Sequence, residues 1–200
     1  MKSGLRPVIT ILSGIFLALV LGLIGMLVIG QAEKSHSSLP ILAELQDFHS
    51  ISQNGTAFGL ADMKGKINIV DFIFTRCQSV CPLMTPNMAE LYRKFDSSDK
   101  VQFVSITVDP AYDSLNILSE YARNFGVNDN RWVFLWQPVE DVVRLSEKGF
   151  MLPADDLPMG HSTKFVLVDR AGRIRAYYDG TDPRSVKAIS ADIRALAKSS

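Results

Sequence analysis

Hydrophobic positions follow two different patterns along this chain. Residues 7–30 (PVITILSGIFLALVLGLIGMLVIG) are almost entirely apolar and carry no charge, and a polar stretch, residues 31–40, follows them. From residue 41 onward, short β-branched and aromatic runs alternate with segments whose apolar residues recur every three to four positions. The short β-branched and aromatic runs are typical of buried strands, and the spacing of three to four positions is typical of helices with one buried face. The chain therefore divides into an apolar N-terminal block and a folded domain.

The folded domain is predicted to have the element order β-α-β-α-β-α-β-β-α. The predicted strands are residues 67–75, 101–108, 131–136, 164–169 and 173–178, and the predicted helices are residues 84–95, 114–125, 139–149 and 183–197. Before them, residues 41–48 form a short amphipathic piece, and residues 58–65 a strand running into a turn. Alternating strands and helices indicate an α/β fold, with a partly parallel sheet between helices and an antiparallel hairpin at its end.

The apolar block is long enough to cross a membrane. At about 1.5 Å per residue, residues 7–30 would make a helix of roughly 35 Å, against a hydrocarbon core of about 30 Å. The apolar core of a cleaved signal peptide is shorter, about 7–15 residues. We therefore predict an uncleaved transmembrane anchor, and the domains 1–6 (cytoplasmic), 7–30 (anchor), 31–44 (tether) and 45–200 (folded domain).

Charges next to the anchor predict its orientation. Lys2 and Arg6 precede it without an acidic residue, whereas Glu33 and Lys34 cancel after it. The positive-inside rule then places the N-terminus in the cytoplasm and exports the folded domain. The short N-terminus contains no Arg- and Ser-rich transit segment, which favours a bacterial inner membrane with the domain in the periplasm.

Composition and motifs exclude several classes of function. The chain has 21 basic and 21 acidic residues, so without Lys2 and Arg6 the remainder has 19 against 21, a net charge of −2. That balance gives no reason to expect nucleic acid or anionic lipid as a partner. No glycine-rich phosphate loop, G-x-S-x-G or H-E-x-x-H motif occurs. Nucleotide enzymes and hydrolases that depend on these motifs are therefore excluded.

The chain has two cysteines, Cys77 and Cys81, in the segment FTRCQSVCPLMTP between a predicted strand and a predicted helix. An exported domain permits a disulfide, but so short a loop would constrain little of the unfolded chain. We therefore expect a redox-active pair rather than a structural one. Either Pro82 or Pro86 can start the helix, so Cys81 lies at or just before its N-terminus, where the thiolate is favoured. The spacing allows both a disulfide and a shared metal ion.

A metal ion would need a third ligand, and two thiolates with an imidazole suit copper or zinc. Of the three histidines, His36 is predicted to be solvated in the polar stretch and His49 to lie at the surface. His161 precedes the predicted strand 164–169. If that strand lies beside strand 67–75, His161 meets the cysteines at the same edge of the sheet.

Four further residues have open roles. Met159 is a weaker ligand candidate than His161. Asp109 and Asp113 follow a buried strand; an ordinary strand-to-helix turn is the favoured interpretation, and an acidic docking edge near the cysteines is the alternative. Asp71 lies inside an apolar strand, where a buried carboxylate needs a partner that the sequence does not identify.

These motifs together resemble a known family. Pro86, five residues after Cys81, resembles the helix proline of thioredoxin-fold proteins, but thioredoxins have C-x-x-C and this chain has C-x-x-x-C followed by proline. The longer spacing resembles the Sco/SenC family of copper chaperones for cytochrome c oxidase. The resemblance covers most of residues 45–198. It rests on Phe72-Ile-Phe-Thr-Arg-Cys77, Cys81-Pro82, Ser105-Ile-Thr-Val-Asp-Pro110 with Asp113, and His161-Ser with Phe165-Val-Leu-Val-Asp169.

The resemblance implies a thioredoxin-like three-layer sandwich with a mixed central sheet. It also implies one copper ion per chain, held by Cys77, Cys81 and His161 as Cu(I), with Cu(II) tolerated. Such proteins help to build the binuclear copper centre of the copper-bearing subunit of cytochrome c oxidase, by copper delivery, thiol reduction or both. Other copper chaperones and thiol reductases are further expected partners.

Two alternative functions remain open at this point. The main one is an exported thiol–disulfide oxidoreductase without a physiological metal role, which would need the two cysteines but not His161. The other is a peroxidase-like enzyme, because peroxiredoxins share the fold. We expect mainly a metallochaperone, and thiol–disulfide reductase activity is the enzymatic function that the cysteines allow.

Overall fold

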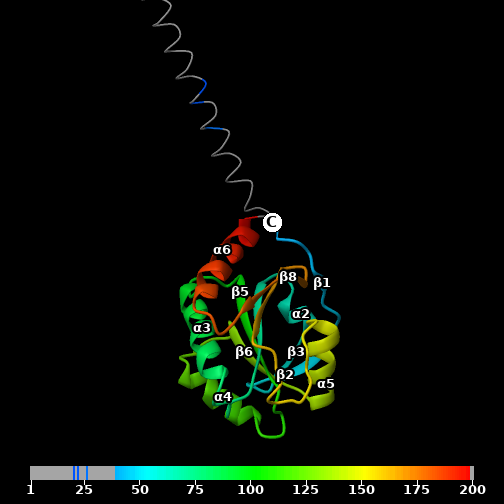
Figure 1. Ribbon diagram of the computed structural model, residues 1–200. Helices are drawn as coiled ribbons and strands as arrows, with labels where there is room; N and C mark the ends of the chain where they lie inside the picture. The colour runs from blue at the N-terminus through cyan, green and yellow to red at the C-terminus, as the bar shows by residue number, and fades with distance from the viewer. Residues whose placement is uncertain (1–19, 21, 23–25, 27–38, 199–200) are drawn as a thin grey trace, which may run out of the picture. The chain divides into compact units, whose positions relative to one another are not determined.

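The computed structural model describes residues 20, 22, 26 and 39–198, and the residues from Leu39 onward form one compact unit (Figure 1). Nearly all of the predicted anchor and the first eight residues of the tether lie outside the described residues. Within the described part of the chain, no helix is long and apolar enough to cross a membrane. The anchor therefore stays a prediction.

The folded unit is built on one mixed sheet with the strand order β1-β8-β7-β4-β5-β6-β2-β3. The strands are β1 (Ala43–Glu44), β2 (His49–Ser52), β3 (Ala57–Gly59), β4 (Ile67–Ile73), β5 (Val101–Thr107), β6 (Trp132–Trp136), β7 (Lys164–Val168) and β8 (Arg173–Asp179). Strands β4, β5 and β6 are parallel, and the strands that flank them are antiparallel. The β7 strand pairs with β4, as the prediction for His161 required.

Helices cover both faces of the sheet. They are α2 (Leu60–Met63), α3 (Cys81–Lys94), α4 (Leu115–Asn124), α5 (Val139–Arg144), the π-helix η1 (Leu145–Gly149) and α6 (Arg184–Lys198). Every residue of β4 and β5 is buried, as expected for strands covered on both sides. Tyr92 of α3 packs against Phe103, and Phe150, just after η1, packs against Phe72. Phe103 pairs with Ile69, so Phe72 lies on the other face. Figure 1 shows α3 and α6 on one side and α5 on the other.

The predicted α/β fold with a mixed central sheet is confirmed, and several details differ. Residues 58–65 form the end of β3 and then α2, and β2 is an additional strand, whose short polar sequence HSIS gave no clear strand pattern. The predicted helix 139–149 is α5 continued by η1. Helix α3 begins at Cys81 and continues through Pro86. Because Pro86 has no backbone N–H, the carbonyl of Pro82 in the first turn loses its helical hydrogen bond. A loss so close to the helix start is tolerated.

Candidate metal centre

The segment leading to Cys77 is held by two aspartates that follow β5. The carboxylate of Asp113 accepts hydrogen bonds from the backbone N–H of Thr75 at 3.2 Å, from the Thr75 hydroxyl and from the Thr107 hydroxyl. Asp109 forms an ion pair with Arg76 at 2.7 Å, and the guanidinium also lies over the ring of Tyr112. The end of β4 is therefore fastened to the end of β5 immediately before Cys77.

The two cysteines are both free thiols, and their environments differ. Burial opposes ionisation of Cys77, but hydrogen bonds from the backbone N–H groups of Cys81 and Ser79 and from the Ser79 hydroxyl outweigh it and lower the pKa of Cys77 to about 6. Cys81 is the first residue of α3 and is almost fully buried. Burial, followed by the neighbouring Cys77, raises the pKa of Cys81 above its usual value. In the metal-free protein Cys77 is thus the more readily ionised thiol.

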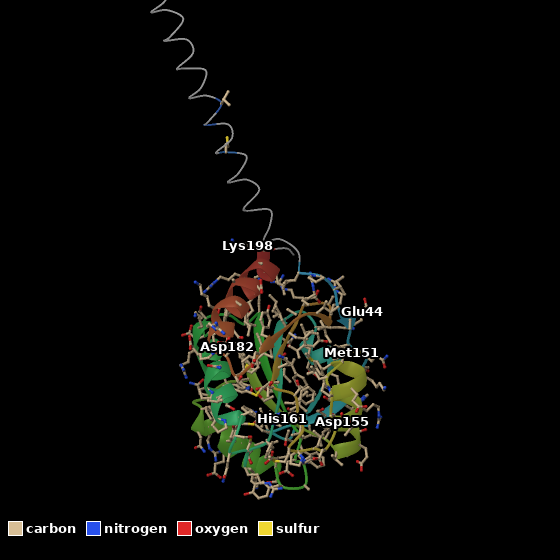
Figure 2. All side chains as sticks on the ribbon, in the orientation of Figure 1. Glu44, Met151, Asp155, His161, Asp182 and Lys198 are labelled. Atoms are coloured by element: carbon tan, nitrogen blue, oxygen red, sulfur yellow. The ribbon has the colours of Figure 1, made fainter. Side chains whose placement is uncertain are left out.

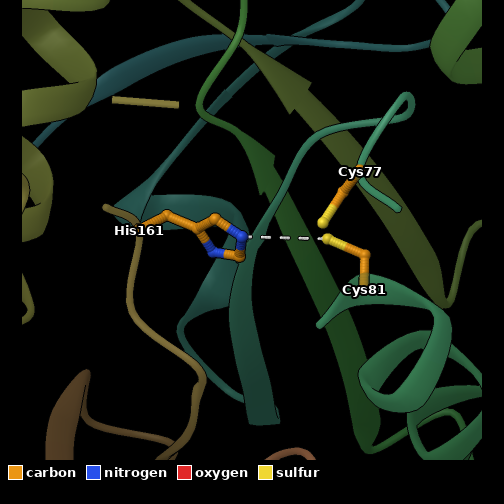
Figure 3. A group of neighbouring side chains, drawn as sticks. All are labelled: Cys77, Cys81 and His161. Atoms are coloured by element: carbon orange, nitrogen blue, oxygen red, sulfur yellow. Dashed lines mark hydrogen bonds between the residues drawn. The ribbon is translucent and has the colours of Figure 1, made fainter. Parts of the chain in front are cut away.

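His161 reaches the cysteines from the loop before β7. A backbone hydrogen bond of 3.0 Å from Gly160 to Asp156 closes the turn that precedes it. The imidazole packs edge-to-face against Phe74, with the ring centroids 5.5 Å apart. Its Nδ1 lies 3.1 Å from the carbonyl oxygen of Ser162, and its Nε2 lies 3.8 Å from Cys81 Sγ (Figure 3). A carbonyl only accepts, so this contact puts the proton on Nδ1 and directs the Nε2 lone pair toward the sulfurs.

The structure brings the three predicted ligands together. The ligand atoms of Cys77, Cys81 and His161 lie within 4.8 Å of one another, and no other group of three or more His, Cys, Asp or Glu residues in the described part of the chain could hold a metal ion. The side chains are buried, with 9%, 1% and 7% of their residue surfaces exposed. Two sulfurs and one imidazole nitrogen are a soft donor set, which fits Cu(I) and suits Zn²⁺ as well.

The other predicted candidates lie apart from this group. His49 is an exposed residue of β2, and His36 is outside the described residues. Met159 is 68% exposed. Asp113 is completely buried, which favours the strand-to-helix turn and leaves Asp113 no surface for a docking edge. Figure 2 shows His161 and Asp155 at one end of the folded unit and Glu44 and Lys198 at the other.

Asp71 lies on β4, and the partner expected for it is not found among the described residues. The side chain is fully buried and neither carboxylate oxygen has a hydrogen-bond partner. Burial raises the pKa of Asp71 to about 7, and the nearby Ser105 side chain opposes part of that rise. A protonated, neutral carboxyl is the physical solution to this environment.

Reasoning from the sequence did not identify the supporting residues Thr75 and Thr107. Each stands at or just after the end of a buried strand, and both hydroxyls donate to Asp113. Threonines near the ends of two neighbouring parallel strands were the available signal, but they acquire meaning only when the strands are known to pair.

Comparisons with known proteins point to one family. The model of the SCO1/SenC family matches residues 41–198. The SCO1 protein homolog of Bacillus subtilis is 28% identical over 164 residues, covering 79% of this chain and 85% of the relative. The crystal structure of a SCO1/SenC family lipoprotein from Bacillus anthracis is 34% identical, with a TM-score of 0.74, covering 80% of this chain and 99% of that one. The structure of Bradyrhizobium japonicum ScoI with copper bound is 25% identical, with a TM-score of 0.63, covering 76% and 98%.

Proposed function

The chain belongs to the SCO1/SenC family, and we propose that it is a copper-binding protein that helps to assemble the binuclear copper centre of cytochrome c oxidase. Copper delivery, reduction of cysteines in the copper-bearing subunit, or both would be its task. In this proposal residues 7–30 anchor the protein in a bacterial inner membrane, and the folded domain works in the periplasm. The apolar sequence and the charges of Lys2 and Arg6 support this placement.

The observation that carries the proposal is the convergence of Cys77, Cys81 and His161 within 4.8 Å. The two thiolates and the imidazole Nε2 would hold one Cu(I) ion in a three-coordinate site, and the nitrogen donor makes Cu(II) tolerable. The copper-bound structure of Bradyrhizobium japonicum ScoI supports the choice of copper over zinc. Because thiol ligands bind as thiolates, copper uptake releases protons, and the lowered pKa of Cys77 makes that ligand available at neutral pH.

The same thiols support the reducing task. When two thiols form a disulfide, two electrons and two protons leave the pair, and an oxidised cysteine pair in a partner protein can accept them. The Cys77 thiolate is suited to attack such a partner, and Cys81, buried at the helix start, is placed to complete the exchange. Oxidation of Cys77 and Cys81 to a disulfide would abolish copper binding, so the redox state of the pair would control the metal site.

A copper titration tests the site. The full chain, purified in mild detergent, reduced and metal-free, is titrated with Cu(I) in competition with a chelator, as wild type, His161→Ala and His49→Ala. His49 is a matched control because it is an exposed histidine outside the site. We expect one copper ion per chain in the wild type and in His49→Ala. Loss of a ligand in His161→Ala should weaken binding at least tenfold, about 1.4 kcal/mol.

The same titration distinguishes the proposed function from the alternative one. Disulfide exchange needs only Cys77 and Cys81, so copper affinity and a copper spectrum unchanged in His161→Ala would contradict the three-ligand site. Rapid reduction of a disulfide substrate by that variant would then favour an exported thiol–disulfide oxidoreductase.

A further inference from the structure

Helix α3, which carries Cys81, is tied to the strands that follow His161 by a buried asparagine. Asn87 is 7% exposed, and its Nδ2 donates a hydrogen bond of 2.8 Å to the carbonyl oxygen of Gly180. The backbone N–H of Gly180 in turn donates to the carbonyl oxygen of Thr163, also at 2.8 Å. Thr163 is two residues after His161, and Asn87 is six residues after Cys81. These bonds form a continuous connection between the two ligand-bearing segments.

The packing around Gly180 is tight, so the two segments that it connects have little room to move relative to each other. A Cβ atom on Gly180 would lie 2.8 Å from the Thr163 oxygen, 3.0 Å from Cε1 of Phe165 and 3.1 Å from Cε of Met84. Met84, like Asn87, belongs to α3, whereas Phe165 belongs to β7. The helix therefore packs against Gly180, which in turn packs against the segment that leads out of the His161 loop, and the hydrogen bond of Asn87 fixes the first of these two contacts.

The loop on the other side of His161 gives less support. Residues 151–160 contain no strand or α-helix, and Met151 and Met159 in it are exposed. The turn closed at Gly160 and the side of Thr163 therefore together fix the position of the imidazole relative to Cys81. Helix α3 and strand β7 are stiff over these short distances. A displacement of Asn87 should therefore change the distance between Cys81 Sγ and His161 Nε2.

We propose that Asn87 is a positioning residue of the metal site, which sets the spacing between Cys81 and His161 through Gly180 and Thr163. The inference rests on the proposed function, because it takes these residues as copper ligands. It requires a hydrogen-bond donor at position 87, since the Gly180 carbonyl can only accept. Asn87→Leu removes the donor at similar size, and Asn87→Asp places an oxygen against the carbonyl oxygen.

The test compares Asn87→Leu with Tyr92→Phe in the full chain. Tyr92 is also a buried residue of α3, and its hydroxyl donates to Asn128, away from the His161 side. Both variants should lose similar thermal stability. Asn87→Leu alone should lower Cu(I) affinity about tenfold, in the range found for residues that orient metal ligands, and shift the sulfur-to-Cu(II) charge-transfer band. In the metal-free protein it alone should shift the imidazole resonances of His161.

A double-mutant cycle shows whether the effect passes through His161. In a His161→Ala background, Asn87→Leu should change Cu(I) affinity by less than about twofold, because the residue that it positions is gone. If Asn87→Leu folds poorly, Asn87→Asp takes its place in the same cycle. Copper affinity and spectrum equal to those of Tyr92→Phe would overturn the inference, as would a tenfold loss that persists without His161. If His161→Ala itself leaves copper binding unchanged, the proposed function fails first.

Discussion

The cysteine side and the histidine side of the site are held in different ways. Before Cys77, the side chains of Thr75 and Arg76 are bound by two carboxylates, Asp113 and Asp109, from the neighbouring strand's end. His161 instead follows an irregular loop, and a turn, a ring contact with Phe74 and a carbonyl contact hold it. The cysteine side is therefore held by charged hydrogen bonds, whereas packing and backbone geometry hold the histidine side.

Because of this difference, substitutions on the cysteine side and on the histidine side should affect stability and copper affinity to different extents. Loss of Asp113, the buried carboxylate that accepts hydrogen bonds on the cysteine side, leaves polar groups unpaired and costs stability. A change of shape on the histidine side moves one ligand and should cost copper affinity more than stability. The following predictions use this contrast, in order of decreasing expected effect on the free energy of unfolding.

The largest effect is expected from Asp71→Asn. The folded-state pKa of about 7 exceeds the ordinary 3.8, so the folded protein keeps a proton that the unfolded chain releases as the pH rises. The stability associated with that proton is complete below about pH 4 and is lost as the pH rises toward 7. Asparagine resembles the neutral carboxyl, so the variant should be more stable than wild type by about 4 kcal/mol at pH 8. Urea unfolding at pH 4 and pH 8 measures it, and equal stabilities at pH 8 would show that Asp71 is not held neutral.

A second large effect is expected from Asp113→Ala. The substitution leaves the Thr75 N–H and the buried Thr107 hydroxyl without their acceptor, which should lower the free energy of unfolding by about 3 kcal/mol. Copper affinity should fall as well, because the segment before Cys77 loses its attachment. Asp113→Asn keeps one acceptor oxygen and should lose less of both. Wild-type stability in Asp113→Ala would mean that the cysteine side is not held by this carboxylate.

On the histidine side, Gly160→Ala should affect copper more than folding. A Cβ atom at this position would lie 1.9 Å from the backbone oxygen of Asp155, so the turn must open and His161 must move. We expect a loss of about 2 kcal/mol in stability and at least tenfold in copper affinity. Gly55→Ala is the control: its φ of +77° strains the new residue by about 1 kcal/mol, but its Cβ meets nothing. Equal copper affinities in the two variants would contradict a geometric role of this turn.

The smallest effect is expected from Arg76→Gln, although Arg76 is adjacent to Cys77. Its side chain is 55% exposed, and solvent screens exposed ion pairs so that they contribute little to stability. Stability and copper affinity should therefore stay close to those of wild type, as chemical unfolding and copper competition can measure. A loss comparable to that in Asp113→Ala would show that the ion pair of Asp109 with Arg76 contributes as much to the attachment of the cysteine side as Asp113 does.

Much of the fold was predictable because it depends on patterns that are local in sequence. The buried strands 67–75 and 101–108 and the helix 114–125 were recognised from residue types alone, and the structure confirms them with small shifts at the ends. Strand β2 was not recognised, because its short, half-polar sequence becomes a strand only by pairing with β3 and β6. The π-helical end of α5 also depends on packing rather than on residue type.

By itself, the sequence determined which side chains are able to bind a metal: the C-x-x-x-C-P motif at a helix start, and one histidine ahead of a buried strand. The tertiary structure decided which of them meet. The pairing of β7 with β4 brings His161 to Cys77 and Cys81, and leaves His49 outside. It also decided that the Asp71 carboxylate has no hydrogen-bond partner among the described residues and that Asp113 has three donors. The physical reason is that ligand chemistry belongs to single residues, whereas distances between residues 80 apart are set by strand pairing and packing.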